Sequence, residues 1–163
     1  MYLDSSVIVA SIFVGSPHSE AADEFLQHLI IHGSTVYFSE LVRFEYAQAI
    51  RNLATRRNLL PAAQREQFNL DRWEGDLFVR THWLSYADAK LNMLIDQFAG
   101  SYEGPFQRDL WNRILSLMAY YDLKSYDAVH LATAQHHGIA HFATCDRHFA
   151  AINGLSLFLV RDS

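Results

Sequence analysis

Four acidic side chains stand where the strands and helices expected from the sequence begin or end. They are Asp4, Glu45, Asp127 and Asp146. Asp4 and Asp146 each follow a short apolar run typical of a strand, while Asp127 and Glu45 fall in the first and second turns of expected helices. Sites in open parallel sheets gather beyond the carboxyl ends of the strands. If the strands form such a sheet, the four carboxylates can converge at one of its edges.

Converging carboxylates favour one kind of chemistry. Their negative charges repel one another and raise the pKa of some of the group, and a hard divalent cation relieves that repulsion. Ligation by oxygen alone favours Mg²⁺ or Mn²⁺ over Zn²⁺. Such an ion can activate a water, orient a phosphate and stabilise charge on a leaving oxygen. Hydrolysis of a phosphodiester needs all three, so the pattern predicts metal-dependent phosphodiester cleavage.

Each of these residues also has a structural interpretation. An aspartate at the start of a helix often caps it or offsets its dipole, which would suffice for Asp127 and Asp146. Glu45 lies at the margin of an apolar helix face and could be an ordinary surface residue. Asp4 is harder to explain in this way, because a carboxylate in a short buried strand is costly unless it binds something.

The composition is that of a folded protein of one domain, which we expect to span residues 1–163. Cys145 is the only cysteine, so no intrachain disulfide can form. No apolar run approaches the ~18 residues of a membrane span, and the N-terminus lacks a secretory signal. We therefore expect a cytoplasmic location and no membrane partner. The net charge of −5 means that a nucleic-acid enzyme would need local basic patches or bound cations.

Hydrophobic periodicity predicts an α/β protein, with a central parallel sheet between layers of helices. The expected strands are residues 1–4, 36–38, 141–145 and 155–160. The expected helices are residues 16–33, 40–55 and 125–138, with Ser39 as the N-cap of the second. Residues 61–123 are predicted to be mostly helical, with an interruption at 100–105 and no strand. One apolar stripe there is expected in the core: Leu110, Trp111, Ile114, Leu115, Met118 and Tyr121.

Four segments carry the four acidic residues, and their order and spacing span nearly the whole chain. They are residues 3–9, 39–45, 125–134 and 143–149. Taken together, they resemble PIN-domain ribonucleases, and within that family the VapC-type toxins of bacterial and archaeal toxin–antitoxin pairs. The chain is longer than many such toxins. The excess falls between about residues 71 and 123, and its role is left open.

The resemblance implies a PIN-like α/β/α sandwich with an acidic pocket. Carried over by position, Asp4, Glu45, Asp127 and Asp146 would be both the catalytic and the metal-binding residues, with Mg²⁺ or Mn²⁺ as the cofactor. Ser6 and Thr144 fall where the family often places a hydroxyl near the site and would contact the substrate, although both could be turn or cap residues. The resemblance also implies a homodimer and a small antitoxin that fills the pocket, often with a basic side chain.

Other side chains could also contribute to the site. Arg43 begins a run of arginines that could contact RNA backbone or an antitoxin, or simply form a solvated helix face; the others are Arg51, Arg56 and Arg57. His130 follows Asp127 by one helical turn and could orient the site, but packing between helices is the favoured interpretation. The histidine pairs at 28 and 32 and at 137 and 141 lack a clear third zinc ligand. We expect Cys145 to be a buried hydrophobe rather than a nucleophile.

Together these observations predict a metal-dependent endoribonuclease that acts as a toxin. Two alternatives stay open. One is a structure-specific DNA nuclease, since related folds use similar acidic pockets. The other is a non-catalytic PIN-like domain that binds RNA or a protein partner.

Overall fold

Five parallel strands form one sheet in the computed structural model, which describes residues 1–13, 18–56 and 59–162. The strand order is β3-β2-β1-β4-β5. The strands are β1 (Tyr2–Leu3), β2 (Thr35–Ser39), β3 (Gly100–Gly104), β4 (His141–Thr144) and β5 (Ser156–Leu159). The expected α/β fold with a central parallel sheet is therefore confirmed.

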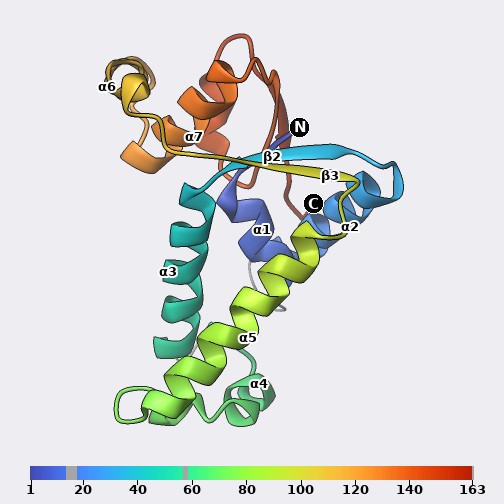
Figure 1. The fold of residues 1–163 in the computed structure, drawn as a ribbon, viewed down its shortest axis with the longest axis vertical. Helices are drawn as coiled ribbons and strands as arrows, with labels where there is room; N and C mark the ends of the chain where they lie inside the picture. Colours follow the sequence, from blue (N-terminus) through green and yellow to red (C-terminus); the bar gives the residue numbers. More distant parts are fainter. Residues whose placement is uncertain (14–17, 57–58, 163) are drawn as a thin grey trace.

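Helices cover both faces of this sheet (Figure 1). They are α1 (Ser5–Ile12), α2 (Ser19–Ile31), α3 (Leu41–Thr55), α4 (Ala62–Gln67), α5 (Leu77–Ile95), α6 (Trp111–Tyr121) and α7 (Ser125–His136). Short 3₁₀ turns lie at Leu70–Arg72, Arg108–Leu110 and Arg147–Ala151. Among the described helices, none combines the length and apolar character needed to cross a bilayer.

The two-residue strand β1 is the centre of the sheet because it can bury both faces. Tyr2 packs into the core on the side of α6 and α7, whereas Leu3 packs into the core on the side of α1, α3 and α5. Successive side chains of a strand point to opposite faces, so two apolar residues suffice. Because β1 lies between β2 and β4 and runs parallel to both, the carboxyl ends of the three strands meet at one edge.

The strand β3 was missed by the prediction that residues 61–123 contain no strand. It pairs in parallel with β2 at five successive positions. The sequence Gly-Ser-Tyr-Glu-Gly has little intrinsic strand preference, because glycine and glutamate are depleted in strands. Pairing with β2 supplies the missing stabilisation, and β3 is an edge strand with a partly exposed surface. Such a strand is set by tertiary pairing rather than by its own residues.

An arm formed by α3, α4 and α5 extends away from the sheet (Figure 1). Trp83 of α5 is fully buried against α3, and its indole nitrogen donates to the carbonyl of Ile50 at 2.9 Å. Tyr46 of α3 donates in turn to the carbonyl of Ala87 at 2.7 Å. The buried Arg65 of α4 donates to the carbonyl of Ala54 near the end of α3. The extra segment between about residues 71 and 123 thus forms α5 of this arm, the edge strand β3 and the helix α6.

Two local predictions were wrong. Trp111 and Leu115 were expected in the core stripe of α6, but they are 54% and 45% exposed, and the helix buries Leu117 instead. The helix is amphipathic as predicted, but the face that packs against α7 is rotated relative to the predicted stripe and is centred on Ile114 and Leu117. Ser39 is not the N-cap of α3. Glu40 holds that position, and the Ser39 hydroxyl faces the interior.

The boundaries of α2 agree with the sequence pattern at its C-terminal end. Gly33 follows the helix with a positive φ of 62°, a conformation that suits glycine. The predicted start at residues 16 and 17 lies outside the described residues, and the described helix begins at Ser19.

The contrast between two tryptophans gives a test of the arm. We expect Trp83→Phe to reduce the free energy of unfolding by about 1–3 kcal/mol, because it removes a buried hydrogen bond to the Ile50 carbonyl and leaves unfilled space beside α3. The same substitution at the exposed Trp111 should change it by less than about 0.5 kcal/mol. Urea denaturation followed by far-UV circular dichroism measures both. Equal effects of the two substitutions would contradict the packing described for α5.

Candidate metal centre

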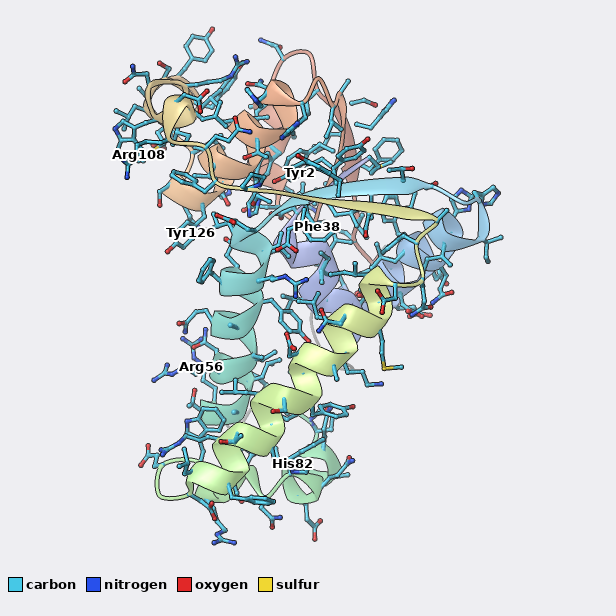
Figure 2. The ribbon with its side chains drawn as sticks, in the orientation of Figure 1. Tyr2, Phe38, Arg56, His82, Arg108 and Tyr126 are labelled. Atoms are coloured by element: carbon cyan, nitrogen blue, oxygen red, sulfur yellow. The ribbon has the colours of Figure 1, made fainter. Side chains whose placement is uncertain are left out.

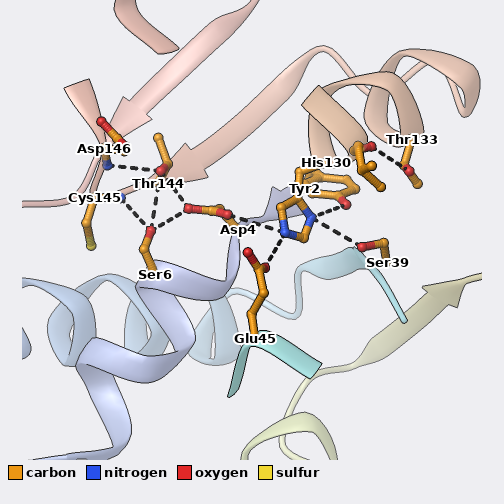
Figure 3. Close-up of polar contacts among 11 residues, drawn as sticks. Tyr2, Asp4, Ser6, Ser39, Glu45, His130, Thr133, Thr144, Cys145 and Asp146 are labelled. Atoms are coloured by element: carbon orange, nitrogen blue, oxygen red, sulfur yellow. Dashed lines mark hydrogen bonds and ion pairs between the residues drawn. The ribbon is translucent and has the colours of Figure 1, made fainter. Parts of the chain in front are cut away.

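Asp4 is a nearly buried carboxylate at the carboxyl end of β1. It is the N-cap of α1 but makes no side-chain cap hydrogen bond, and only 5% of it is exposed. Its Oδ2 instead accepts hydrogen bonds from the hydroxyls of Ser6 and Thr144, the second at 2.8 Å. Its Oδ1 lies on the other side, 3.7 Å from Nε2 of His130. One oxygen is therefore held by hydroxyls, and the other faces the centre of the site (Figure 3).

Glu45 and His130 meet Asp4 from two different helices. Oε2 of Glu45, in α3, lies 2.6 Å from Nε2 of His130, in α7, and His130 is completely buried. One potential ligand atom from each of Asp4, Glu45 and His130 lies within 4.8 Å of the others. Residues 41 and 85 positions apart in the sequence are thus gathered within reach of a single cation.

The charges of this group act on one another. Burial raises the pKa of Glu45, but the hydrogen bond and charge of His130 outweigh burial, and the net pKa is lowered. Burial lowers the pKa of His130, but the bond to Glu45 and the charges of Asp4 and Glu45 outweigh it, and the net pKa is raised. At neutral pH Glu45 is therefore an ionised carboxylate whose negative charge is partly offset by its histidine partner.

Asp127 and Asp146 lie outside the group of three but belong to the same electrostatic neighbourhood. Burial raises the pKa of Asp127, and the negative charges of Asp4 and Asp146 raise it further. Asp146 follows β4, where its backbone N–H donates to Thr144 Oγ1 at 3.0 Å. Its carboxylate accepts from the backbone N–H of His148 and pairs with the ring of that residue. Asp146 is thus also the cap that the structural interpretation expected.

Residues 1–155 match the model of the PIN domain family. The chain belongs to the PIN domain family. PIN domains are generally metal-dependent nucleases, and carboxylate oxygens on Asp4 and Glu45 are the ligand type that hard divalent cations prefer. The residues present therefore fit a divalent ion at this edge of the sheet. None of the curated proteins compared with this PIN domain matches it.

Ser6 and Thr144 of the PIN domain act on Asp4 in this structure. Besides donating to Oδ2, the Ser6 hydroxyl lies 3.3 Å from that of Thr144 and accepts the backbone N–H of Cys145 at 3.0 Å. These bonds tie β4 to the start of α1 and restrict the rotation of the Asp4 carboxylate. Direct contact between either hydroxyl and a substrate stays a prediction.

Arg43 is engaged by other elements of the PIN domain. Its Nε donates to the carboxylate of Glu103 in β3 at 2.9 Å, and Nη1 donates to Asn92 in α5 at 3.1 Å. The guanidinium therefore joins α3 to the edge strand and the arm, and its charge is offset by Glu103. A role in substrate binding stays a prediction. Arg56 directly follows α3 and points outward (Figure 2), and Arg57 lies outside the described residues.

His130 is the residue whose importance the sequence analysis underrated. It does pack between elements, as expected, but both ring nitrogens are also hydrogen bonded, and one of these bonds reaches Glu45. Its spacing of one turn from Asp127 was the available signal. Its other nitrogen contacts Tyr2 and Ser39. Nothing in the sequence indicates these two contacts, because Tyr2 resembles an ordinary strand residue and Ser39 resembles a helix cap.

The remaining sequence expectations concern cysteine and zinc. Cys145 is buried, and burial raises the pKa of its thiol to about 11, so it is a protonated hydrophobe and not a nucleophile. In the described part of the chain, no second group of three potential metal ligands accompanies the one at Asp4. The rings of the paired histidines 28 and 32 contact each other, with centroids 4.0 Å apart and planes tilted by 35°.

The raised pKa of Asp127 predicts a gain in stability when its charge is removed. Because folding raises this pKa above 3.8, the folded state binds more protons, and ionisation at neutral pH destabilises it. Asp127→Asn should therefore raise the urea midpoint at pH 7 in the presence of a chelator, and the gain should disappear as the pH falls to 3.8. The exposed Asp23 of α2 provides the control, since Asp23→Asn should leave the midpoint unchanged. A lower midpoint for Asp127→Asn at pH 7 would refute the electrostatic coupling.

Proposed function

We propose that this PIN domain, spanning residues 1–163, is an Mg²⁺- or Mn²⁺-dependent endoribonuclease that acts as the toxin of a type II toxin–antitoxin pair. The observation that supports it best is the convergence of Asp4 and Glu45 at the carboxyl edge of the sheet, within reach of one cation. Four sequence segments with the order and spacing of VapC-type toxins point to the toxin branch of the family.

The acidic residues have different roles in the proposed site. Asp4 and Glu45 would hold the ion, and Asp127 and Asp146 would complete the acidic pocket as further ligands or through bound water. When bound, the ion would lower the pKa of a water molecule and offset the charge of the scissile phosphate. For that reason no side chain has to serve as a general base. Ser6 and Thr144 would keep one oxygen of Asp4 occupied, so that the other stays directed at the ion.

A single-stranded substrate is favoured by aromatic side chains next to two of the site carboxylates. Phe44 precedes Glu45 and is 69% exposed, and Tyr126 precedes Asp127 and is 56% exposed. Tyr126 lies on the outside of the molecule (Figure 2). Exposed aromatic rings of this kind stack on unpaired bases with little dependence on sequence. RNA loops and unpaired RNA segments therefore suit this surface better than a regular duplex.

The proposed protein partners are an antitoxin and a second copy of the chain. The acidic site suits a basic side chain from an antitoxin, because such a side chain would offset the same charges as the metal ion. Large apolar residues are exposed on α6 and next to it, which is typical of surfaces that bind other proteins. They are Phe106, Trp111, Leu115 and Tyr120.

Removal of one carboxylate tests the nuclease activity. We expect Asp4→Asn to lower the rate of RNA cleavage in Mg²⁺ or Mn²⁺ at least about 100-fold, which corresponds to about 2.7 kcal/mol of lost transition-state stabilisation. Asp23→Asn should cleave like the wild type. Gel assays on total RNA and on flap DNA, run in parallel, decide between ribonuclease and DNA nuclease. Unchanged cleavage by folded Asp4→Asn protein would refute the assignment of Asp4 to the metal site of a nuclease.

Metal binding separates an active enzyme from a non-catalytic binding domain. An ion that binds only the folded state at 100 times its Kd stabilises that state by about 2.7 kcal/mol. We expect Mn²⁺ to raise the melting temperature of the wild type, and Asp4→Asn to lose most of this increase. Differential scanning calorimetry measures both. A wild-type melting temperature that does not respond to Mn²⁺ would favour the non-catalytic alternative.

A further inference from the structure

The ring of His130 stands between two kinds of polar group. Its Nε2 faces carboxylates, with Oε2 of Glu45 at 2.6 Å and Oδ1 of Asp4 at 3.7 Å. Its Nδ1 faces hydroxyls, with Tyr2 Oη at 3.0 Å and Ser39 Oγ at 3.2 Å. Figure 3 shows the ring lying between these two pairs. The two nitrogens are therefore not equivalent.

These neighbours determine which nitrogen carries hydrogen. An ionised carboxylate only accepts hydrogen bonds, so Nε2 must carry a hydrogen to bond Glu45 at this distance. A hydroxyl both donates and accepts, so Tyr2 and Ser39 satisfy Nδ1 whether it is bare or protonated. Burial raises the pKa of Tyr2, so its hydroxyl keeps its own hydrogen. The hydrogen on Nε2 is thus set by the surroundings of the ring, whatever the charge on that ring.

The same contacts prevent the ring from turning. Tyr2 and Ser39 are almost completely buried at the adjoining strands β1 and β2, so water does not compete for their hydroxyls. The Tyr2 ring meets His130 edge-on with centroids 5.9 Å apart, and stacks on Phe142 of β4 at 5.0 Å. Glu45 reaches the ring from α3 and is also hydrogen bonded to Ser5, at the start of α1. The ring of His130, fixed from its other side, therefore restrains the Glu45 carboxylate at Oε2.

We propose that His130 is a positioning residue, which donates its Nε2 hydrogen to Glu45 and holds that carboxylate beside Asp4 so that both can bind one divalent cation. This proposal rests on the proposed function, because that function requires the divalent cation. Partners that orient a ligand in this way typically change metal affinity by about 10- to 100-fold when removed. The competing arrangement makes Nε2 a metal ligand itself, which would suit a softer transition metal.

The first test observes the ring directly. Nitrogen-15 NMR of the metal-free wild type should show a protonated Nε2 on His130. Pulsed electron paramagnetic resonance of the Mn²⁺-loaded protein should show no directly coordinated imidazole nitrogen. A bare Nε2 in the metal-free protein, or strong nitrogen coupling to Mn²⁺, would overturn the proposal.

The second test uses two amide substitutions that differ only in reach. In His130→Gln the side-chain amide extends to about the position of Nε2, whereas in His130→Asn it reaches only about as far as Nδ1. We expect titration calorimetry to show Mn²⁺ affinity within about 3-fold of the wild type for His130→Gln, and about 10- to 100-fold weaker for His130→Asn. Urea denaturation of both variants separates lost positioning from lost folding, and if His130→Asn does not fold, Tyr2→Phe and Ser39→Ala replace it, with smaller losses expected in the same direction.

The outcomes also separate this proposal from the proposed function. Wild-type protein that binds Mn²⁺ with the predicted dependence on His130, but cleaves no RNA, would support the positioning role and refute the ribonuclease. RNA cleavage by the wild type, with equal Mn²⁺ affinity in folded His130→Gln and His130→Asn, would do the reverse.

Discussion

The burial of one carboxylate is the constraint on which the rest of the site depends. Asp4 follows a strand only two residues long, and it is almost without contact with solvent. A charge in such a place is tolerated only when its oxygens have partners. Hydroxyls of Ser6 and Thr144 occupy one oxygen, and the other faces His130 and Glu45. The surrounding side chains thus hold the Asp4 carboxylate in a position where a cation can bind to it.

The parallel sheet provides the geometry that makes this arrangement possible. With β1 between β2 and β4, the chain leaves all three strands at the same edge, so α1, α3 and the turn after β4 begin close together. Asp4, Glu45 and Asp146 are carried there by these connections, and α7 adds Asp127 and His130. Beyond Glu45, the arm of α3, α4 and α5 extends away from this edge and is held by its own contacts, which include Trp83 and Arg65.

His130 links the charge of the site to its rigidity. A cluster of carboxylates is self-repelling, and proteins commonly lose stability to keep such a group for function. The raised pKa of Asp127 shows that repulsion persists here. The contact between His130 and Glu45 offsets part of it with a hydrogen bond, while Tyr2 and Ser39 fix the ring from the opposite side. Stability and preorganisation thus come from one buried side chain.

Local sequence was enough to predict most elements and the four acidic candidates, because apolar periodicity and the ends of elements are visible in neighbouring residues. It also determined that Cys145 packs as a hydrophobe. It could not predict β3, whose glycines pair only because β2 lies alongside, nor the exposure of Trp111. The partnership of His130 with Tyr2, Ser39 and Glu45 was equally hidden. The hydrogen bonds of His130, which join residues up to 128 positions apart, depend on how the helices pack on the sheet, and only the tertiary structure decides that.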